Sequence, residues 1–255
     1  MNVEQLLDRV VRLAEADDRI AAVLVYGSHA SGRADEHSDV DIGLVVADDA
    51  HAQVLAERDV LVRALGEPLF AEDFGDPSNG HVIYADGTAC EFIIKREREL
   101  DLSRPYRSLL DKTGVVARVL ARPGPAAEAP GAETVRWLLA VFWHDFEHVT
   151  VALARGQLLW AHGAMEEMRG ICLQLVRLSV GAAQEPDDPY WKVDGLLPPE
   201  VAERLRATIV PLEREPMREA TQALLALYRD LARGLASAHR LAYPEALDRL
   251  LSARL

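Results

Sequence analysis

Gly27-Ser28-His29-Ala30-Ser31-Gly32-Arg33 and, a few residues later, Ser38-Asp39-Val40-Asp41 are the two strings that decide how this chain folds. An apolar run at 20–26 precedes the first string, and another at 42–46 follows the second. Both runs are typical of strands, in which side chains alternate between two faces. Asp39 and Asp41 are therefore expected on the same face of one strand, with their carboxylates side by side.

Two adjacent carboxylates suit a divalent cation. Mg²⁺ is commonly bound through one or two carboxylates together with the phosphates of a substrate. A Gly-Ser turn ahead of a short helix offers backbone N–H groups and a hydroxyl to such phosphates. The pattern predicts a nucleoside triphosphate site; the alternative is a solvated acidic turn that happens to contain Asp35, Glu36, Asp39 and Asp41.

The string G-S-x-A-x-G-x5-S-D-x-D resembles, residue for residue, the core motif of the DNA polymerase β-like nucleotidyltransferase superfamily. It is most similar to that of the small bacterial enzymes that adenylylate aminoglycoside and lincosamide antibiotics. The resemblance implies ATP as co-substrate, Mg²⁺ as cofactor and transfer of AMP to a hydroxyl of a small cationic acceptor. It also implies an α+β fold, a mixed sheet with helices followed by a helical bundle.

A third carboxylate is needed for a two-metal site, and Glu91 is the candidate. Runs at 81–84 and 88–95 flank Ala85-Asp86-Gly87, which predicts a hairpin and places Glu91 within an otherwise apolar strand. A charge in such a run is costly unless it is paired or bound to metal. The resemblance implies that this carboxylate completes the metal site or removes the acceptor proton; the alternative is an edge-strand glutamate facing water.

Further contacts to the nucleotide are expected from both halves of the chain. Gly27 allows a close backbone approach and Ser28 offers a phosphate hydroxyl. Ser38 binds phosphate or only shapes a turn, and Arg33 neutralises the triphosphate or is solvated. By resemblance, Lys192 contacts the nucleotide phosphates, with a solvated lysine as the alternative.

The order of elements predicts two domains, a nucleotidyltransferase domain at 1–122 and a helical substrate-binding domain at 132–255. Asn2 and Gln5 form a predicted capping box for a first helix, a second helix is expected at about 50–65, and a short strand pair around 111–120. Three prolines and two glycines at 121–131 mark a linker. Apolar residues at helical spacing then predict helices at 133–154 and 157–180, joined by Arg155-Gly156 as an antiparallel hairpin.

Composition narrows the class of partner. Residues 1–125 hold 14 Lys and Arg against 23 Asp and Glu, so −9 of the net charge of −13 lies in the half with the predicted site. Such a half repels a polynucleotide and attracts a cation.

The sequence shows no sign of a membrane segment or of export. No apolar run approaches the length of a membrane span, and the first residues lack a basic leader. Cys90 and Cys172 are too far apart for a metal pair. A cytoplasmic protein with free buried thiols is expected.

Several readings stay open beside the main one. Asp145, Glu147 and Glu166 either contact the amines of the acceptor or are solvated. His144-Asp145-Phe146-Glu147-His148 matches H-x-x-E-H, but it lies in an amphipathic helix and has no identifiable third zinc ligand.

Arg155 and His162 have the spacing of a HEPN-type ribonuclease, although Arg155-Gly156 is more simply a helix-ending turn. The acceptor could also be a protein or tRNA in a toxin-antitoxin system, or a lincosamide, and a non-enzymatic nucleotide-binding module is disfavoured because all three carboxylates are present.

Overall fold

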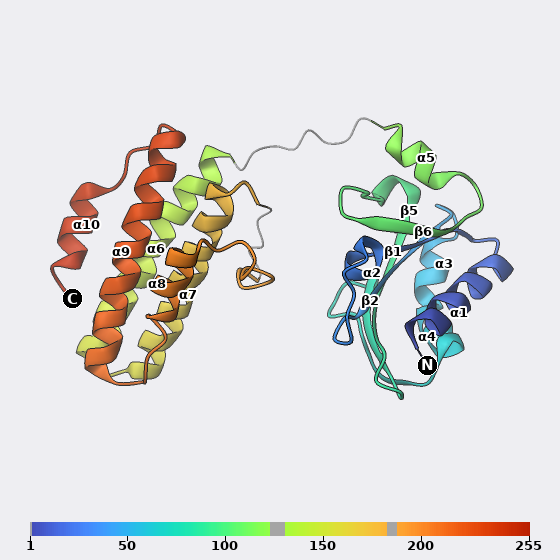
Figure 1. The fold of residues 1–255 in the computed structure, drawn as a ribbon, viewed down its shortest axis with the longest axis horizontal. Coiled ribbons are helices and arrows are strands. Elements are labelled where there is room, and N and C mark those ends of the chain that lie inside the picture. The colour runs from blue at the N-terminus through green and yellow to red at the C-terminus, as the bar shows by residue number, and fades with distance from the viewer. Residues whose placement is uncertain (1, 123–130, 183–187) are drawn as a thin grey trace. The chain divides into compact units, whose positions relative to one another are not determined.

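The computed structural model describes residues 2–122, 131–182 and 188–255 (Figure 1). The chain divides into two compact units, Met1–Ala126 and Ala127–Leu255. Each unit has its own hydrophobic core. Of the predicted linker at 121–131, residues 123–130 lie outside the described residues.

The first unit is built on a six-stranded mixed sheet with the strand order β3-β4-β5-β2-β1-β6. β2 and β5 are parallel neighbours, and all other neighbouring pairs are antiparallel. The strands are β1 (Ile20–Tyr26), β2 (Val40–Val46), β3 (Pro68–Glu72), β4 (Asn79–Tyr84), β5 (Ala89–Arg96) and β6 (Tyr106–Asp111). The predicted strands at 20–26 and 41–46 and the hairpin of β4 and β5 are confirmed.

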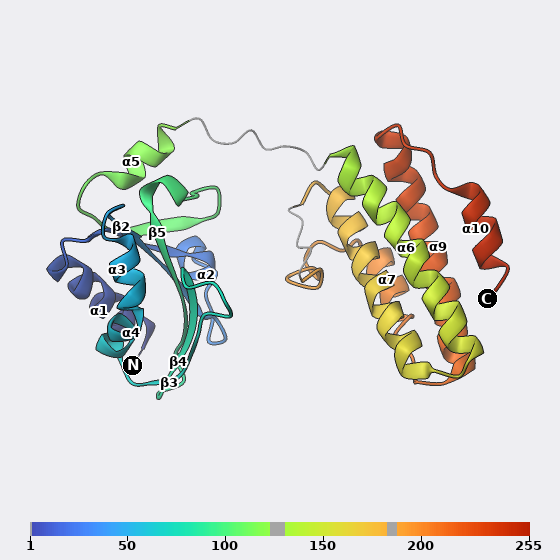
Figure 2. The same cartoon turned by 180° about the vertical axis from the view of Figure 1, so that it is seen from behind.

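One face of this sheet is covered by α1 (Val3–Ala16), α3 (His51–Ala56) and α4 (Arg58–Leu65), as Figure 2 shows. The Asn2 side chain accepts a hydrogen bond from the Gln5 N–H, and the Gln5 side chain accepts one from the Asn2 N–H, which confirms the capping box. Alternate residues of β2 and β5 are buried in this core: Val40, Ile42, Leu44, Cys90, Phe92 and Ile94. Because strand side chains alternate, Asp39, Asp41 and Glu91 lie on the opposite face of the sheet.

Two sequence predictions for this unit are wrong in detail. The single helix expected at about 50–65 is two helices that meet at Glu57, whose carboxylate is 2.8 Å from the Arg19 guanidinium. The strand pair expected at 111–120 is the strand β6 followed by the helix α5 (Val115–Leu120). Gly114 turns the chain with a φ of +73°, and the Asp111 carboxylate accepts hydrogen bonds from the first N–H groups of α5.

The second unit is helical, as predicted. Its helices are α6 (Ala132–Ala154), α7 (Leu158–Ser179), α8 (Pro199–Arg206), α9 (Arg214–Ala238) and α10 (Glu245–Ser252). α6 and α7 run side by side, and Gly156, with a φ of +69°, turns the chain between them (Figures 1 and 2). In the core the Phe142 and Tyr228 rings stack with centroids 3.6 Å apart, and the Tyr228 hydroxyl donates to the Leu139 carbonyl at 2.8 Å.

Within the described ranges, no helix has the length and apolar character that crossing a membrane requires. Cys90 and Cys172 are both free and both buried, which confirms the expectation of free buried thiols. Burial raises the pKa of Cys172 to about 12, so this thiol stays protonated at neutral pH.

Candidate active site

The pairing of β2 with β5 brings the predicted carboxylates together. In this parallel pair Asp41 is the register partner of Glu91, and Asp39 lies two residues before Asp41 on the same face. One carboxylate oxygen from each of the three residues lies within 4.8 Å of the other two. Three carboxylates from segments about fifty residues apart in sequence therefore converge on one point.

The Gly-Ser turn lies directly against this group. Gly27 has a φ of +63°, and a Cβ atom built on it would be 2.2 Å from Oδ2 of Asp41. Real Cβ atoms essentially never come that close, so only glycine fits without moving the carboxylate. The backbone of the turn and the Asp41 carboxylate thus share the space in which a phosphate and a cation would meet.

Glu91 is the most accessible of the three carboxylates. Its side chain is 50% exposed, whereas Asp39 and Asp41 are half-buried. β5 lies between β4 and β2, so Glu91 is on an interior strand and not on an edge. A proton acceptor at this position could be reached by a second substrate from solvent.

The three negative charges also act on the buried residue beside them. Burial, followed by the charges of Asp41, Asp39 and Glu91, raises the pKa of the Cys90 thiol well above its usual range. The Cys90 side chain is on the helix-covered face of β5, where it is part of the core. It is consequently a packing residue and not a nucleophile of the site.

Ser28 lies in the first turn of the short helix α2 (Gly27–Ser31), and Arg33 follows its C-cap, Gly32. The Ser28 carbonyl accepts the Arg33 N–H at 3.0 Å, which closes the turn. The Arg33 side chain is exposed, and its Nε donates to the Ser31 hydroxyl at 3.2 Å. Gly27, directly before Ser28, is the residue of this turn that lies against the Asp41 carboxylate.

The Ser38 hydroxyl is engaged in a turn. It donates to the Asp35 carboxylate at 3.0 Å and accepts the Asp35 N–H at 3.0 Å. The His37 N–H and the Ser38 hydroxyl lower the pKa of Asp35. This turn sets the direction in which the chain enters β2, and hence the position of Asp39.

Lys192 belongs to the helical unit, where it has a φ of +49° and its ammonium lies 4.4 Å from the centre of the Trp191 ring. The Tyr190 hydroxyl donates to the Glu166 carboxylate at 2.8 Å, and Arg177 donates to the Trp191 carbonyl. The segment that carries Lys192 is thus fastened to α7 through the two residues directly before the lysine.

The three acids proposed for the acceptor differ in their surroundings. Glu166 is paired with the buried Arg169 as well as with Tyr190. Asp145 is nearly buried and contacts His144. Glu147 is half-buried, and no hydrogen bond or ion pair of its side chain is found among the described residues.

His81 is a residue of the site that the sequence interpretation missed. It is the antiparallel register partner of Glu91, and its Nδ1 lies 3.9 Å from a Glu91 carboxylate oxygen. The signal was present, because both residues are five positions from Asp86 at the predicted hairpin turn. Residues at equal distances from such a turn face each other across the pair.

Comparison with known proteins defines the class of this chain. A family model described as streptomycin adenylyltransferase matches residues 1–253. The protein is a nucleotidyltransferase, and the chain belongs to the streptomycin adenylyltransferase family, which confirms the resemblance of the motif. No curated protein matches. Among solved structures, the crystal structure of an aminoglycoside 6-adenyltransferase from Bacillus subtilis matches over 100% of this chain and 98% of that chain, at 18% identity and a TM-score of 0.49.

Proposed function

We propose that this enzyme transfers the AMP group of ATP to a hydroxyl of an aminoglycoside and that Asp39, Asp41 and Glu91 hold Mg²⁺ for this reaction. The observation that carries the proposal is the convergence of these three carboxylates beside the Gly27 turn. All donors of the group are carboxylate oxygens, the ligand type that Mg²⁺ prefers. Membership of an adenylyltransferase family supports AMP as the transferred group.

The reaction forms a bond between the acceptor oxygen and the α-phosphorus and breaks the bond from that phosphorus to the bridging oxygen, so that pyrophosphate leaves. Bound Mg²⁺ would neutralise charge on the triphosphate and fix its orientation. Gly27 and Ser28 direct backbone N–H groups and a hydroxyl at the phosphates, and Arg33 adds positive charge. Glu91, the most exposed carboxylate of the group, is also the one to which we assign the proton of the acceptor hydroxyl, a role that the kinetics of Glu91→Gln separates from metal binding.

We assign the nucleotide to the domain at 1–122 and the recognition of the acceptor to the helical domain at 132–255. Lys192 contributes a positive charge for the nucleotide phosphates. Glu147 is the acid best suited to an acceptor amine, since Glu166 is paired with Arg169 and Tyr190 and Asp145 is nearly buried. Within the part of the chain that the structure describes, the Glu147 carboxylate has no hydrogen-bond or ion-pair partner, so its charge is available to a ligand.

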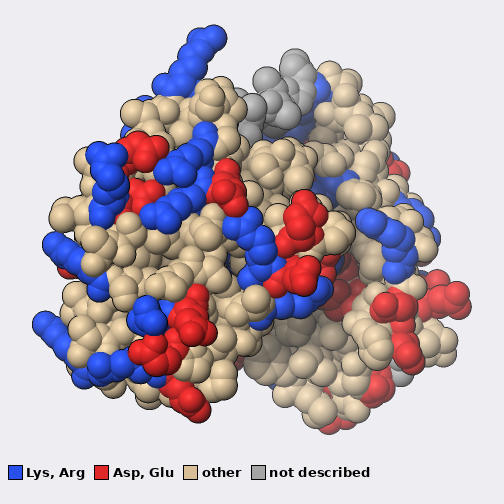
Figure 3. Space-filling model, turned by 60° about the vertical axis from the view of Figure 1, so that its left-hand side comes forward, with Lys and Arg blue, Asp and Glu red and all other residues tan. Residues whose placement is uncertain are grey.

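The charge of the protein is consistent with a cationic acceptor. The net charge is −13. On the face drawn in Figure 3, basic and acidic side chains are interspersed, and neither sign forms a continuous stripe. A polynucleotide acceptor would call for a basic footprint. An aminoglycoside carries several amines and is attracted by a negative protein.

We place the enzyme in a reducing cytoplasm, where buried free thiols persist.

The test is transfer of label from α-labelled ATP, in the presence of Mg²⁺, to a panel of aminoglycosides, lincosamides and small proteins. The proposal predicts labelled aminoglycoside and release of unlabelled pyrophosphate. Label on a lincosamide or a protein would show that the acceptor belongs to that class instead, while the proposed transferase site would still stand. Omission of Mg²⁺ is the matched control, and transfer at an undiminished rate without divalent cations would contradict the metal assignment.

A further inference from the structure

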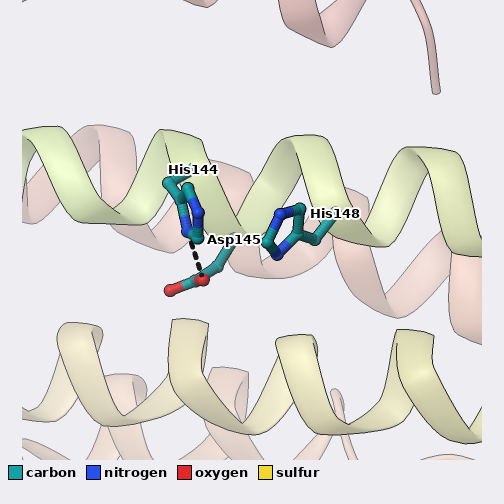
Figure 4. Close-up of side chains that lie close together, drawn as sticks. All are labelled: His144, Asp145 and His148. Atoms are coloured by element: carbon teal, nitrogen blue, oxygen red, sulfur yellow. Dashed lines mark hydrogen bonds and ion pairs between the residues drawn. The ribbon is translucent and has the colours of Figure 1, made fainter.

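A second group of metal-ligating side chains lies on α6, in the helical unit. His144 and His148 are one helical turn apart, and their ring centres are 4.1 Å from each other. Asp145 lies beside them, with an Oδ1 that is 3.0 Å from Nδ1 of His144 (Figure 4). One ligand atom from each of the three residues lies within 4.8 Å of the other two.

The burial of the three side chains is uneven in a way that favours a bound cation. The Asp145 side chain is only 12% exposed, whereas that of His144 is 63% exposed. A nearly buried carboxylate is costly unless a positive partner compensates it. The only hydrogen-bond or ion-pair partner of the Asp145 side chain found among the described residues is His144. An ion from solvent can reach this carboxylate past the exposed imidazole.

We propose that His144, Asp145 and His148 form a binding site for a borderline transition-metal dication such as Zn²⁺, Ni²⁺ or Cu²⁺. Imidazole nitrogen suits these ions, and a carboxylate oxygen is an accepted further ligand. Two histidines at i and i+4 lie on the same face of a helix and can bind one ion together. Three protein ligands leave at least one coordination position to water.

This site differs from the carboxylate group of the sheet in the ion that it selects. Asp39, Asp41 and Glu91 offer only oxygen, which suits Mg²⁺, whereas two of the three ligands on α6 are nitrogen. An excess of Mg²⁺ therefore competes with Zn²⁺ at the sheet site but competes poorly for the imidazole nitrogens of the helical site. The two sites can be measured separately in the full chain.

The site also differs from the H-x-x-E-H pattern of the sequence. In that pattern Glu147 would take part with the two histidines, but the carboxylate that lies among them is that of Asp145. Glu147 is the next acid along the same helix and is outside the group. Asp145 and Glu147 therefore form a matched pair: one variant should remove a ligand and the other should not.

The experiment is a calorimetric titration of the full chain with Zn²⁺ alone as ligand, in a buffer that contains excess Mg²⁺. We expect saturable binding of one ion. His148→Gln should weaken the affinity by at least about 10-fold, the smaller end of the loss caused by removing even an outer partner of a metal site. Asp145→Asn should weaken it as well, while Glu147→Gln and the exposed-histidine control His162→Gln should bind like the unaltered chain.

A second readout follows the tryptophan next to the site. The Trp160 ring centre is 5.4 Å from that of His148. Cu²⁺ bound at the site should quench the fluorescence of Trp160, and this component should be missing from Trp160→Phe. The thermal midpoint in the presence of a chelator shows whether each variant is folded. His148→Gln is the decisive variant. The His148 side chain is less buried than that of Asp145, so its replacement disturbs the fold less.

Two results would overturn the proposal. The first is the absence of Zn²⁺ binding by the unaltered chain under Mg²⁺ excess, which would leave His144 and Asp145 as a simple ion pair without metal. The second is an unchanged affinity in folded His148→Gln, or an equal loss in Glu147→Gln, either of which would place the ion elsewhere.

Discussion

The two groups of metal-ligating side chains are assembled in opposite ways. Asp39, Asp41 and Glu91 come from two strands that are distant in sequence, and only the parallel register of β2 and β5 brings them together. His144, Asp145 and His148 come from one turn of a single helix. The first group depends on the whole sheet, while the second depends only on α6. A site assembled from segments distant in sequence can bring a backbone turn, such as that at Gly27, against a carboxylate. One turn of a helix brings together only its own neighbouring side chains.

The largest expected effect is the loss of transfer in Asp39→Asn and in Asp41→Asn. Each change removes a full charge from the proposed metal site but no packing group of the core. The thermal midpoint should stay the same or rise, because neighbouring carboxylates repel one another in the absence of metal. Turnover and thermal midpoint should be measured on the same preparations. Turnover like that of the unaltered enzyme in either variant would remove the metal role of that residue.

Glu91→Gln is expected to slow the chemical step by about 10² to 10⁴-fold, the usual contribution of a general base. Glutamine has nearly the same shape but cannot accept the proton. Affinity for ATP should change little if Glu91 is the base and should fall together with the rate if it is mainly a metal ligand. Single-turnover rates and nucleotide titrations separate the two roles, and an unchanged rate would transfer the base role to another acid.

Gly27→Ala and Gly32→Ala form a matched pair that tests the close approach to Asp41. Both glycines have positive φ, +63° and +70°, so alanine costs about 1–2 kcal/mol of backbone strain at either position. Only at Gly27 would the new Cβ also collide with the Asp41 carboxylate. A displaced ligand of this kind can cost about 10²-fold in rate. The rate should therefore fall in Gly27→Ala and stay close to normal in Gly32→Ala; equal rates would mean that the contact is unimportant.

The smallest effect is expected at the two cysteines, one in each unit. Both thiols are buried, and the pKa of Cys172 is raised to about 12, so neither should react with a thiol reagent at pH 8 in the native protein. A raised thiol pKa keeps the thiol protonated, and so unreactive, at pH values well below it. Labelling of Cys90 and Cys172 during denaturant titration reports the opening of each unit. Rapid labelling of either thiol without denaturant would contradict the described cores.

The features that were predictable from sequence are local ones. The capping box of Asn2 and Gln5, the hairpin around Asp86-Gly87 and the alternation that places Glu91 opposite its buried neighbours all depend on residues close in the chain. The run at 115–120 was misassigned because short apolar runs suit a strand or a helix equally. Gly114 and the cap from Asp111 favour the helix at 115–120. Glu57, where the predicted helix breaks, pairs with Arg19, which is far away in sequence.

The candidate site shows the same division. Asp39 and Asp41 share a face because side chains alternate along a strand, which the sequence shows. The position of Asp41 beside Glu91 depends on the register between two strands that are distant in sequence. The contact between Gly27 and the Asp41 carboxylate also has no signature in the order of residues. The Ser38 hydroxyl was assigned two possible roles, and its bonds to Asp35 could be seen only in three dimensions.

The most direct measurement is the binding of Mn²⁺, a spectroscopic substitute for Mg²⁺, in the presence of a non-hydrolysable ATP analogue. Electron paramagnetic resonance of free Mn²⁺ gives the amount bound by the unaltered chain, by Asp41→Asn and by His148→Gln. If the carboxylates of β2 and β5 form the nucleotidyl-transfer site, Asp41→Asn loses nucleotide-dependent Mn²⁺ binding and His148→Gln retains it. Retention of this binding in folded Asp41→Asn would contradict the account.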